Sequence, residues 1–510
     1  MRLPTPSRTW ASLGTLWPPR WPPSRAQVVA VALVLGDVAL RVVALAVVPR
    51  NRRPSSAMAW LLAINLIPYA GPLTFAVIGY PELPRARREK QRRMDELIGE
   101  RTIRTTAVSE EQARPPLWLA PVTRMNRRLG AMPFLGGNSA TLHPGGTATL
   151  AAMAAEVDRA QRYVHAEFYL FELDPSTRPF VEALGRAVAR GVTVRVLFDH
   201  LASLRSPGFA ATRRELDRLG VTWRLMLPLQ PLRGRLQRPD LRNHRKLLVV
   251  DGEVGWTGSQ NMVDPGYNKK AYVRRGLRWV DLVARFEGPV VAELDAVFTT
   301  DWYSETDELI PLAERSGPVV HPDDTDGDLD CQVVPSGPGF PEENNLKLFT
   351  AMLHSAQREV VLTTPYFVPD ESLLSAVTTA AHRGVSVELF VCERGDQAMV
   401  HHAQCSYYEV LLRAGVRIWL YPAPAVLHAK HLSVDGEVAA IGSSNMDMRS
   451  FDLNLEVTVM VRGAAFVEAL REVQDDYRAL SRELTVEEWS RRPLRSRMLD
   501  GVARLTSALQ

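Results

Sequence analysis

The chain has 510 residues, of which 46% are hydrophobic, and its formal net charge at pH 7 is only +4. The length allows more than one domain, the composition allows well-packed cores, and so small a net charge points to no particular class of charged partner. The cysteines are odd in number and lack metal-ligand spacing, which argues against a disulfide framework and fits a reducing compartment: Cys331, Cys392 and Cys405.

The N-terminal region begins with a tail, residues 1–25, that is rich in Pro, Trp and Arg and is expected to be irregular. The next stretch, residues 26–48, is apolar for 23 residues, which is long enough for a helix to cross a bilayer. Its only charged residues, Asp37 and Arg41, stand four positions apart and can pair on one face of that helix. Such a pair would lower the cost of burying either charge.

A turn at residues 49–56 leads into a second apolar run, residues 57–80. This run contains Pro68 and Pro72, and transmembrane helices tolerate such helix breakers. A cleaved signal peptide is the alternative for the first run, but that run lacks a small-residue cleavage site and a second hydrophobic run follows at once. The sequence therefore predicts a transmembrane hairpin of two helices within residues 26–80.

Basic residues flank this predicted hairpin. Four arginines precede the first span and three lie in the turn, while six Lys or Arg residues occupy positions 85–93. Because cytoplasmic flanks are enriched in Lys and Arg, the distribution predicts that both ends of the hairpin face the cytoplasm. The 85–93 cluster either attracts anionic headgroups or is only a solvated flank, and residues 81–130 are expected to be a basic connecting region.

The remainder of the chain repeats one alternation of helices and strands. In the first copy, a helix, a strand, a helix and a strand are expected at about residues 148–162, 163–171, 179–190 and 193–198. In the second copy, the same elements are expected at about residues 344–357, 359–364, 371–383 and 386–391. This pattern predicts an α/β fold of two similar domains, residues 131–310 and 331–485, each with a mixed, largely parallel sheet flanked by helices.

The first copy carries an insertion that the second lacks. Val221 and His244 are 23 residues apart, whereas Val416 and His428 are 12 apart. The arginines of the insertion either frame an anionic headgroup at the mouth of a site or belong to a solvated loop: Arg233, Arg235, Arg238 and Arg242.

Two further segments lie outside the repeats. Residues 311–330 contain five aspartates but not the residue order of a calcium loop, so they are interpreted as a solvated acidic linker. Residues 486–510 combine apolar residues at helical spacing with several arginines. They predict an amphipathic helix that lies on an anionic membrane surface, with packing against its own domain as the alternative.

One motif occurs once in each copy, with the form His-x-Lys-x4-Asp-x6-Gly-Ser-x-Asn. The first motif begins at His244 and the second at His428. Because alternate residues of a strand share a face, the histidine and the lysine of each motif are expected to point the same way. Only six of the 61 Lys and Arg residues are lysines, and two of these six are Lys246 and Lys430 at equivalent motif positions. A chance origin of both motifs is therefore improbable.

The pair of motifs resembles the phospholipase D superfamily, in which two copies meet to form one phosphodiester-handling site. The resemblance implies that one histidine attacks phosphorus to give a phosphohistidine, while the other protonates the leaving alkoxide and then deprotonates the incoming alcohol or water. The lysines, with Ser and Asn donors, would hold the phosphate oxygens, so that no metal or other cofactor is needed. The predicted site comprises a catalytic group, His244, Lys246, Asp251, His428, Lys430 and Asp435, and a substrate-binding group, Ser259, Asn261, Ser443 and Asn445.

The motifs alone do not decide which histidine attacks, and the resemblance favours His244 as nucleophile and His428 as general acid and base. It also assigns the orientation of the histidines to acidic residues that follow each motif, here Asp281 and Glu456. Carboxylates suit this role because they fix the tautomer of an imidazole. The two motif aspartates, although part of the motif, are expected to tie strand ends to turns rather than to transfer protons.

The N-terminal hairpin narrows the resemblance to bacterial cardiolipin synthases. Four further segments carry it: residues 59–62, 68–72, 364–370 and 446–451. The resemblance implies a phosphatidyltransferase, integral to the bacterial cell membrane, that condenses two phosphatidylglycerol molecules into cardiolipin and releases glycerol.

Three other functions are weighed against this one. A phospholipase D-type hydrolase or another phosphatidyltransferase is the nearest, because water and other alcohols can also accept a phosphatidyl group. A nuclease is disfavoured by the predicted membrane spans and by the lack of an evident nucleic-acid groove. A non-enzymatic scaffold would not need two intact motifs. The sequence leaves the oligomeric state open.

Overall fold

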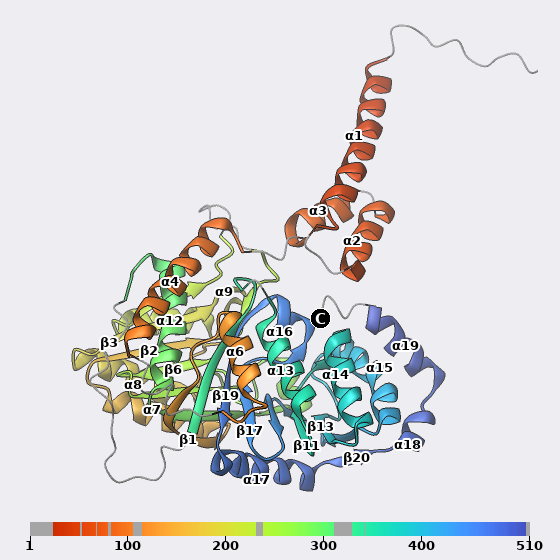
Figure 1. Cartoon of the computed structure of the whole chain (residues 1–510). Coiled ribbons are helices and arrows are strands. Elements are labelled where there is room, and N and C mark those ends of the chain that lie inside the picture. Colours follow the sequence, from red (N-terminus) through yellow and green to blue (C-terminus); the bar gives the residue numbers. More distant parts are fainter. Residues whose placement is uncertain are drawn as a thin grey trace, which may run out of the picture. The chain divides into compact units, whose positions relative to one another are not determined.

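The computed structural model describes residues 24–50, 54–67, 69–79, 83–105, 115–230, 238–310, 329–340 and 342–505. The chain divides into two compact units, Met1–Tyr80 and Pro81–Gln510 (Figure 1). Several predicted features lie outside the described residues: nearly all of the N-terminal tail, most of the acidic linker, and Arg233 and Arg235.

The first apolar run forms helix α1, Arg25–Val47. Among the described residues it is the one helix long and apolar enough to cross a membrane. Its apolar side chains are largely exposed, as in Val34 and Leu35 at 63% each, which suits a helix surrounded by lipid. The predicted charge pair is confirmed, since Arg41 Nε lies 2.8 Å from an Asp37 carboxylate oxygen.

The second apolar run is divided into two helices, α2 (Pro54–Leu66) and α3 (Ala70–Ile78). With 13 and 9 residues, each is shorter than the roughly 20 residues that a spanning helix needs. The break falls where the sequence has Pro68, and proline both lacks an N–H donor and disfavours the helical conformation of the residue before it. The predicted hairpin is therefore confirmed for its first helix only.

The C-terminal unit is built on one 16-stranded sheet, in which fifteen strands follow one continuous order and the sixteenth, β5 (Arg242–Asn243), pairs to the side of it. The two halves of the repeat contribute corresponding strands. The first half gives, in spatial order, β1 (Leu135–Pro144), β9 (Leu282–Glu287), β7 (Val254–Gly258), β6 (Leu247–Val250), β2 (Tyr163–Phe168), β3 (Thr193–Asp199) and β4 (Thr222–Met226). The second half gives β10 (Leu329–Ser336), β19 (Asn454–Arg462), β17 (Val438–Gly442), β16 (His431–Val434), β11 (Glu359–Thr363), β13 (Ser386–Cys392), β14 (Arg417–Tyr421) and the edge strand β20 (Arg482–Leu484). Antiparallel pairing of β1 with β10 joins the halves.

Along the continuous strand order of the sheet, parallel pairing is limited to β2, β3 and β4 in one half and to β11, β13 and β14 in the other, and a few short strands outside this order also pair in parallel. The prediction of a mixed sheet is confirmed, but the sheets are less parallel than expected. The physical reason is that the motif strands return as antiparallel hairpins, β6 with β7 and β16 with β17. Each hairpin turns at a motif aspartate in the left-handed region, Asp251 at φ 54° and Asp435 at φ 56°.

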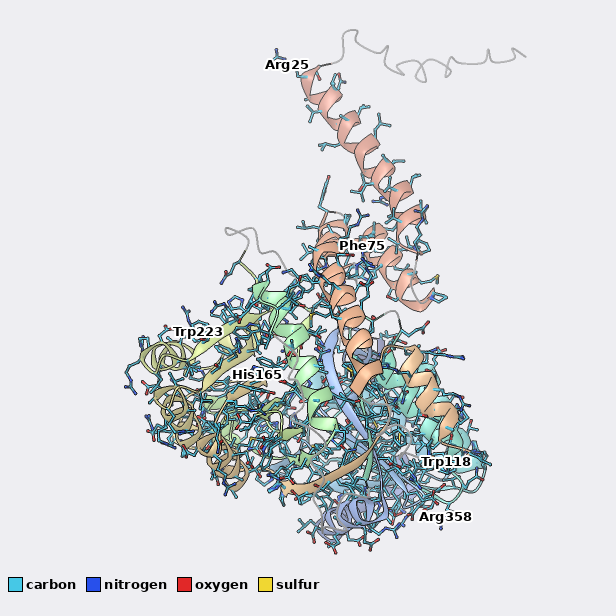
Figure 2. All side chains as sticks on the ribbon, turned by 60° about the vertical axis from the view of Figure 1, so that its left-hand side comes forward. Arg25, Phe75, Trp118, His165, Trp223 and Arg358 are labelled. Atoms are coloured by element: carbon cyan, nitrogen blue, oxygen red, sulfur yellow. The ribbon has the colours of Figure 1, made fainter. Side chains whose placement is uncertain are left out.

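Helices cover both faces of each half (Figure 1). Residues of α7 (Thr147–Arg159) and α8 (Arg178–Ala189) form a core with one face of β2 and β3, and α12 (Val290–Thr306) packs on the other face. In the second half, α13 (Asn344–Ser355), α14 (Glu371–His382) and α17 (Ala464–Leu480) take the corresponding places. Figure 2 shows His165 inside the first half, where its Nδ1 lies 2.6 Å from Asp295 and its ring stacks on Phe298. The helices and strands named in the predicted repeat lie within a few residues of their expected ends.

The remaining elements are mostly short. They are the helices α6 (Ala120–Arg128), α9 (His200–Leu204), α10 (Phe209–Arg218), α11 (Lys270–Arg275), α15 (Ala398–Ala414), α16 (Met448–Asp452), α18 (Val486–Ser490) and α19 (Leu494–Leu505). The short strands are β5 (Arg242–Asn243), β8 (Arg278–Val280), β12 (Phe367–Val368), β15 (Ala425–Leu427) and β18 (Met446–Asp447). The three cysteines are buried and free.

The basic connecting region contains helix α4 (Arg85–Thr105), which packs against α12. Arg87 forms a buried ion pair with Glu305, and Lys90 Nζ lies 2.7 Å from Asp307. Part of the 85–93 cluster is therefore engaged with the first half of the repeat. Neither of the two roles considered for this cluster includes that contact.

The C-terminal helix α19 packs against α15 through a buried carboxylate, Asp500, which accepts from His402 at 2.8 Å and from Arg492 at 2.6 Å. Its apolar side chains remain at least half exposed: Leu494, Met498, Leu499, Val502 and Leu505. Packing against its own unit is thus observed, and contact of the exposed apolar face with a membrane stays a prediction.

Candidate active site

Two short strands hold each motif histidine against the opposite half of the repeat. Strand β5, just before His244, pairs in parallel with β19, and strand β15, just before His428, pairs in parallel with β8. The backbone N–H of His244 donates to the Leu455 carbonyl at 2.8 Å, and that of His428 donates to the Val280 carbonyl at 2.7 Å. The next residue along the chain from each of these carbonyls is a carboxylate.

The two predicted orienting carboxylates bind the histidines in a crossed arrangement. His244 Nδ1 lies 2.9 and 3.1 Å from the two oxygens of Glu456, which belongs to the second half. His428 Nδ1 lies 2.6 Å from Asp281, which belongs to the first half. All four side chains are buried. Each carboxylate accepts a hydrogen bond from the Nδ1–H of its histidine. The proton of the neutral ring is therefore held on Nδ1, and Nε2 is the nitrogen that can react.

The motif serines bind these carboxylates. Ser259 Oγ donates to Asp281 at 2.6 Å, and Ser443 Oγ donates to Glu456. Both serines are fully buried. A hydroxyl can donate one hydrogen bond, and each of these serines donates it to the orienting carboxylate. In this structure the serines therefore position the carboxylates, and their binding of substrate stays a prediction.

The motif asparagines differ from the serines, because both line a cavity. Asn261 Nδ2 donates to the Tyr267 hydroxyl at 2.7 Å and its Oδ1 accepts from the backbone of Leu170. The buried Oδ1 of Asn445 has no hydrogen-bond partner within the described part of the chain. That oxygen is an acceptor and cannot bind a phosphate oxygen, so the predicted role toward substrate would belong to Asn445 Nδ2, which can donate.

The cavity has a volume of about 620 Å³ and contains both motif histidines in its wall. This volume is typical of small-molecule sites. Its aromatic lining residues are Tyr169, Tyr267, Tyr272, Trp279 and Tyr366. Its basic lining residues other than the histidines are Arg205, Arg242, Lys269 and Arg449. Both halves contribute to the lining, as the predicted site at a domain interface requires.

The motif lysines are buried beside the histidines. Lys246 Nζ donates to the His244 carbonyl at 2.5 Å and Lys430 Nζ donates to the His428 carbonyl at 2.6 Å. Burial lowers the pKa of Lys246 to about 7 and that of Lys430 to about 8, and the nearby Glu456 and Asp281 oppose the shift. An ammonium group has three protons to donate, so each lysine keeps donors for an anion that enters the site.

The histidines are neutral in the free site, whereas their carboxylates are ionised. Burial lowers the pKa of His244 to about 4 and that of His428 to about 3, although the carboxylates oppose this shift. Burial alone would raise the pKa of Glu456 and Asp281, but the adjacent histidine, lysine and serine outweigh it and both pKa values are lowered. At pH 7 the free site therefore contains neutral imidazoles, as a nitrogen nucleophile requires, next to ionised carboxylates.

The two motif aspartates lie outside this cluster. Asp251 accepts from three consecutive backbone N–H groups, at residues 161–163, each at 2.8 Å. Asp435 accepts from the equivalent groups at residues 357–359, at 2.7 to 2.9 Å. Both carboxylates fasten a hairpin turn to the start of a strand, β2 or β11. These bonds agree with the structural role expected for them, and their place in the catalytic group stays a prediction.

Two groups of site residues were not anticipated from the sequence. The first is aromatic: the Tyr169 ring packs edge-on against His244 at a centroid distance of 4.9 Å, and Tyr267 against His428 at 6.4 Å. Tyr169 directly follows β2, and a residue just beyond the carboxyl end of a strand commonly belongs to a site in α/β folds. The position of Tyr169 just after a predicted strand was the sequence signal that could have identified it as a site residue.

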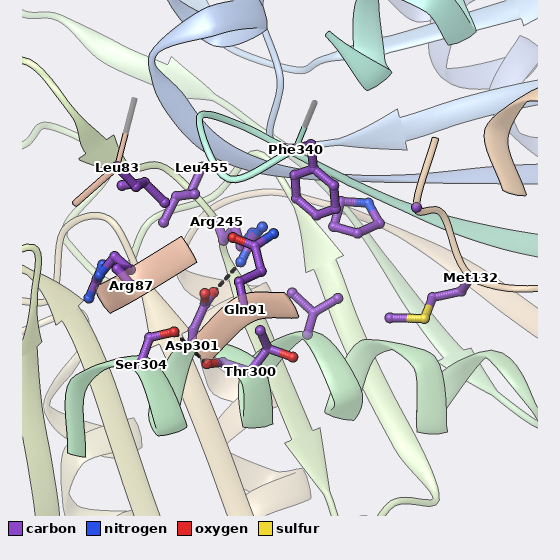
Figure 3. A pocket seen from close by; sticks show the side chains of 13 residues that line it. Leu83, Arg87, Gln91, Met132, Arg245, Thr300, Asp301, Ser304, Phe340 and Leu455 are labelled. Carbon is purple, nitrogen blue, oxygen red and sulfur yellow. Dashed lines mark hydrogen bonds and ion pairs between the residues drawn. The ribbon is translucent and has the colours of Figure 1, made fainter. Parts of the chain in front are cut away.

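The second group of residues holds the backbone of Glu456 in place. Arg245, between the histidine and lysine of the first motif, donates from Nε to the Glu456 carbonyl at 3.0 Å and forms a buried ion pair with Asp301 of α12 (Figure 3). Asp301 is the carboxylate in the ion pair with Arg245, and burial, followed by this neighbour, raises the pKa of Glu167 well above its ordinary value. The second motif has Ala429 at the position of Arg245, so this support exists only for Glu456.

Comparisons with known proteins agree with this geometry. A family model described as cardiolipin synthase, PLD-like domain, matches residues 153–302 and 349–477, and one described as phospholipase D-nuclease N-terminal matches residues 39–79. Cardiolipin synthase A of Serratia proteamaculans is 36% identical over 480 residues, which cover 92% of this chain and 94% of the relative. Cardiolipin synthase A of Yersinia pseudotuberculosis is 34% identical with the same coverage.

Among solved structures, phosphatidylserine synthase of Haemophilus influenzae aligns with a TM-score of 0.56 at 15% sequence identity. The alignment covers 76% of this chain and 99% of that chain. At this identity the likeness shows a common fold and nothing more.

The crossed pairing predicts which substitutions affect only substrates with a poor leaving group and which affect all substrates. If His428 is the general acid, both His428→Ala and Asp281→Asn should slow the first half-reaction of an alkyl phosphodiester by about 10²- to 10⁴-fold but spare that step with an activated nitrophenyl ester, whose leaving group needs no acid. His244→Ala and Glu456→Gln should lose the step with both substrates. Single-turnover release of the leaving group from the two substrates tests this. Asp281→Asn behaving like His244→Ala, its neighbour in the same half, would contradict the crossing.

The Arg245–Asp301 pair predicts a separable effect on stability. Arg245→Met should lower the free energy of unfolding by about 3–5 kcal/mol, because it leaves Asp301 buried without its partner. Arg245→Met combined with Asp301→Leu should recover most of this loss, yet turnover should stay low because the Glu456 carbonyl has lost its donor. Denaturant unfolding and initial rates provide the two measurements.

A matched control for that pair is the exposed ion pair of Arg186 with Asp158. Arg186→Ala is expected to change neither stability nor turnover appreciably, since exposed ion pairs contribute little. Full turnover in the double variant would show that Arg245 does not act through Glu456.

The lowered lysine pKa values predict an alkaline limb in the pH dependence. As pH rises through about 7 to 8, Lys246 and Lys430 lose their protons in the free site, so kcat/KM should fall. A bound anion favours the charged ammonium, so the corresponding limb of kcat should lie at higher pH. Initial rates from pH 6 to 10 test this, and a kcat/KM that stays constant to pH 10 would contradict it.

Proposed function

The chain belongs to the family of phospholipase D-like cardiolipin synthases, and from this premise we propose that its two motif histidines transfer a phosphatidyl group from one phosphatidylglycerol to another. The products are cardiolipin and glycerol. The observation that supports this most directly is the crossed His–carboxylate pairing at a single cavity. That arrangement gives one site two imidazoles with free Nε2 atoms, one for attack and one for proton transfer.

In the first half-reaction, His244 Nε2 attacks the phosphorus of the donor lipid. A P–N bond forms, the bond from phosphorus to the oxygen of the glycerol headgroup breaks, and that oxygen takes the Nε2 proton of His428. His428 enters this step as the imidazolium, because the negative charge of the bound donor phosphate favours its protonated form. Asp281 stabilises the protonated form of His428 through Nδ1. The ammonium groups of Lys246 and Lys430, together with the Asn445 side chain, are suited to bind the charged phosphate oxygens.

In the second half-reaction, the neutral His428 takes the proton from the terminal hydroxyl of a second phosphatidylglycerol. The oxygen attacks phosphorus, the P–N bond breaks, and His244 is released with cardiolipin as product. Water in place of the lipid alcohol would give phosphatidic acid, which is the product of the alternative hydrolase. Which acceptor wins depends on how well the cavity excludes water.

The expected result with labelled phosphatidylglycerol follows from these steps. Detergent-solubilised protein should form cardiolipin and glycerol in equal amounts, and both His244→Ala and His428→Ala should form neither. Lipid products are identified by chromatography and mass spectrometry. Phosphatidic acid as the main product would replace the transferase with the hydrolase.

The family and the apolar helix α1 indicate a bacterial membrane protein. We further propose that α2 and α3 together return across the bilayer, so that the N-terminal tail and the catalytic unit both lie in the cytoplasm. The excess of basic residues on the two outer flanks supports this orientation.

Cysteine labelling in intact cells tests the orientation. Because the three native cysteines are buried, a cysteine introduced at Thr5 should react with a membrane-impermeant maleimide only after the cells are permeabilised. A cysteine at Asn51, in the turn between the spans, should react in intact cells and is the matched control. Labelling of Thr5→Cys in intact cells would mean that α1 crosses the membrane alone.

A further inference from the structure

The cavity contains two cations that the motif chemistry does not use. Within the residues that the structure describes, Arg205 and Lys269 line the cavity without an ion pair or a side-chain hydrogen bond. The other two cations of the lining are engaged, since Arg242 pairs with Asp199 at 2.9 Å and Arg449 donates to the Asp240 carbonyl at 2.9 Å. Arg205 and Lys269 are therefore the cavity cations available to a ligand.

Both side chains line the same cavity. Burial lowers the pKa of Lys269 and the charge of Arg205 lowers it further, while Asp396 and Glu172 oppose the shift. Two like charges at one place in a cavity are unfavourable without an anion between them. The pair thus has the character of an anion site.

Nearby carboxylates are already hydrogen-bonded by neutral donors. Asp396 accepts from the Tyr366 hydroxyl at 2.8 Å and from the Tyr272 hydroxyl at 3.4 Å. Glu172 accepts from the backbone N–H of Gly208 at 2.8 Å and from Ser206 Oγ. Neither carboxylate forms an ion pair with Arg205 or Lys269 within the ranges described, so the two cations keep their donors for an incoming group.

A series of aromatic contacts links Lys269 to His428. Lys269 Nζ is 5.1 Å from the Tyr272 ring, which is 5.0 Å from Trp279. Trp279 stacks on Tyr267 at 4.2 Å, and Tyr267 is 6.4 Å from His428. Among the described residues Lys269 forms no hydrogen bond or ion pair with a motif residue, which is consistent with a second phosphate position in the cavity.

The proposed reaction needs a second phosphate of this kind. Donor and acceptor are both anionic lipids, and after the first half-reaction the donor phosphate is on His244. The acceptor brings its own phosphate, separated by the glycerol headgroup from the terminal hydroxyl that faces His428. The negative charge of the acceptor phosphate has to be neutralised by other cations of the same cavity.

We propose that Arg205 and Lys269 bind the phosphodiester of the acceptor phosphatidylglycerol. This proposal rests on the proposed function of the site. It accounts for the size of the cavity, which exceeds the needs of one reacting phosphate, and it assigns a donor position to the motif lysines and an acceptor position to Arg205 and Lys269. Recognition of an anionic lipid acceptor, in preference to water, then depends on these two cations.

The test compares two reactions of the full-length protein in mixed micelles. Exchange of labelled glycerol into phosphatidylglycerol needs only the donor position, because glycerol re-enters by reversal of the first half-reaction. Cardiolipin formation needs both positions. In Arg205→Ala combined with Lys269→Ala, cardiolipin formation at low phosphatidylglycerol should fall by about 10- to 100-fold, the size expected for lost charge-assisted hydrogen bonds, while exchange should stay within about twofold of the wild type.

Two further variants sharpen the comparison. Lys269→Arg keeps the charge and should restore most of the cardiolipin formation that Lys269→Ala loses. Lys270→Ala removes the neighbouring exposed cation of α11, which does not line the cavity, and should leave both reactions unchanged.

The outcomes separate the two proposals. An equal fall in exchange and cardiolipin formation would place the cations at the donor position or in the fold, and no change in either reaction would show that they bind no lipid. Each of these results overturns the acceptor site. Absence of both reactions in the wild-type protein would instead overturn the proposed function.

Discussion

The carboxylate that holds each catalytic imidazole comes from the opposite half of the chain, and the rest of the site depends on this crossing. Glu456 of the second half orients His244, and Asp281 of the first half orients His428. Each contact is reinforced by a short parallel strand pair that brings the histidine backbone to the residue before the carboxylate. Neither half could form an oriented histidine alone, so the sheet that joins them through β1 and β10 is a requirement of the chemistry.

Burial prepares the charges of this site for an anionic substrate. The histidines are neutral and their carboxylates ionised, while the motif lysines have pKa values near neutrality because burial disfavours their charged form. A phosphodiester that enters such a site brings a negative charge, and this charge favours the protonated form of the lysines. The free energy for binding and for transition-state stabilisation then comes from groups already fixed in place, which is the general basis of electrostatic catalysis.

Much of this site could be predicted from the sequence because its signals are local. The spacing of His, Lys, Ser and Asn in each motif predicts the reacting groups, and the alternation of helices and strands predicts the two similar halves. The crossing could not be predicted, because it depends on which strands become neighbours across the sheet. The contacts of the serines could not be predicted either, because a sequence does not show that each donates its hydrogen bond to a buried carboxylate.

Other differences between prediction and structure also arise from long-range contacts. Arg245 supports Glu456 through α12, more than fifty residues away along the chain, and no motif marks Asp301 as its partner. The second apolar run has the composition of a spanning helix but is divided into α2 and α3. Arg205 and Lys269 are ordinary surface residue types in the sequence, and only the cavity brings them together.

The crossing is tested most directly by locating the phosphatidyl group on the enzyme during turnover. Protein quenched with base in the presence of phosphatidylglycerol and digested at alkaline pH can be mapped by mass spectrometry, with the phosphorus position on the ring assigned by fragmentation. The account predicts an adduct on Nε2 of His244, because Glu456 occupies Nδ1. An adduct on Nδ1 of either histidine would require that the carboxylate contact is absent during catalysis, and it would contradict the crossed arrangement.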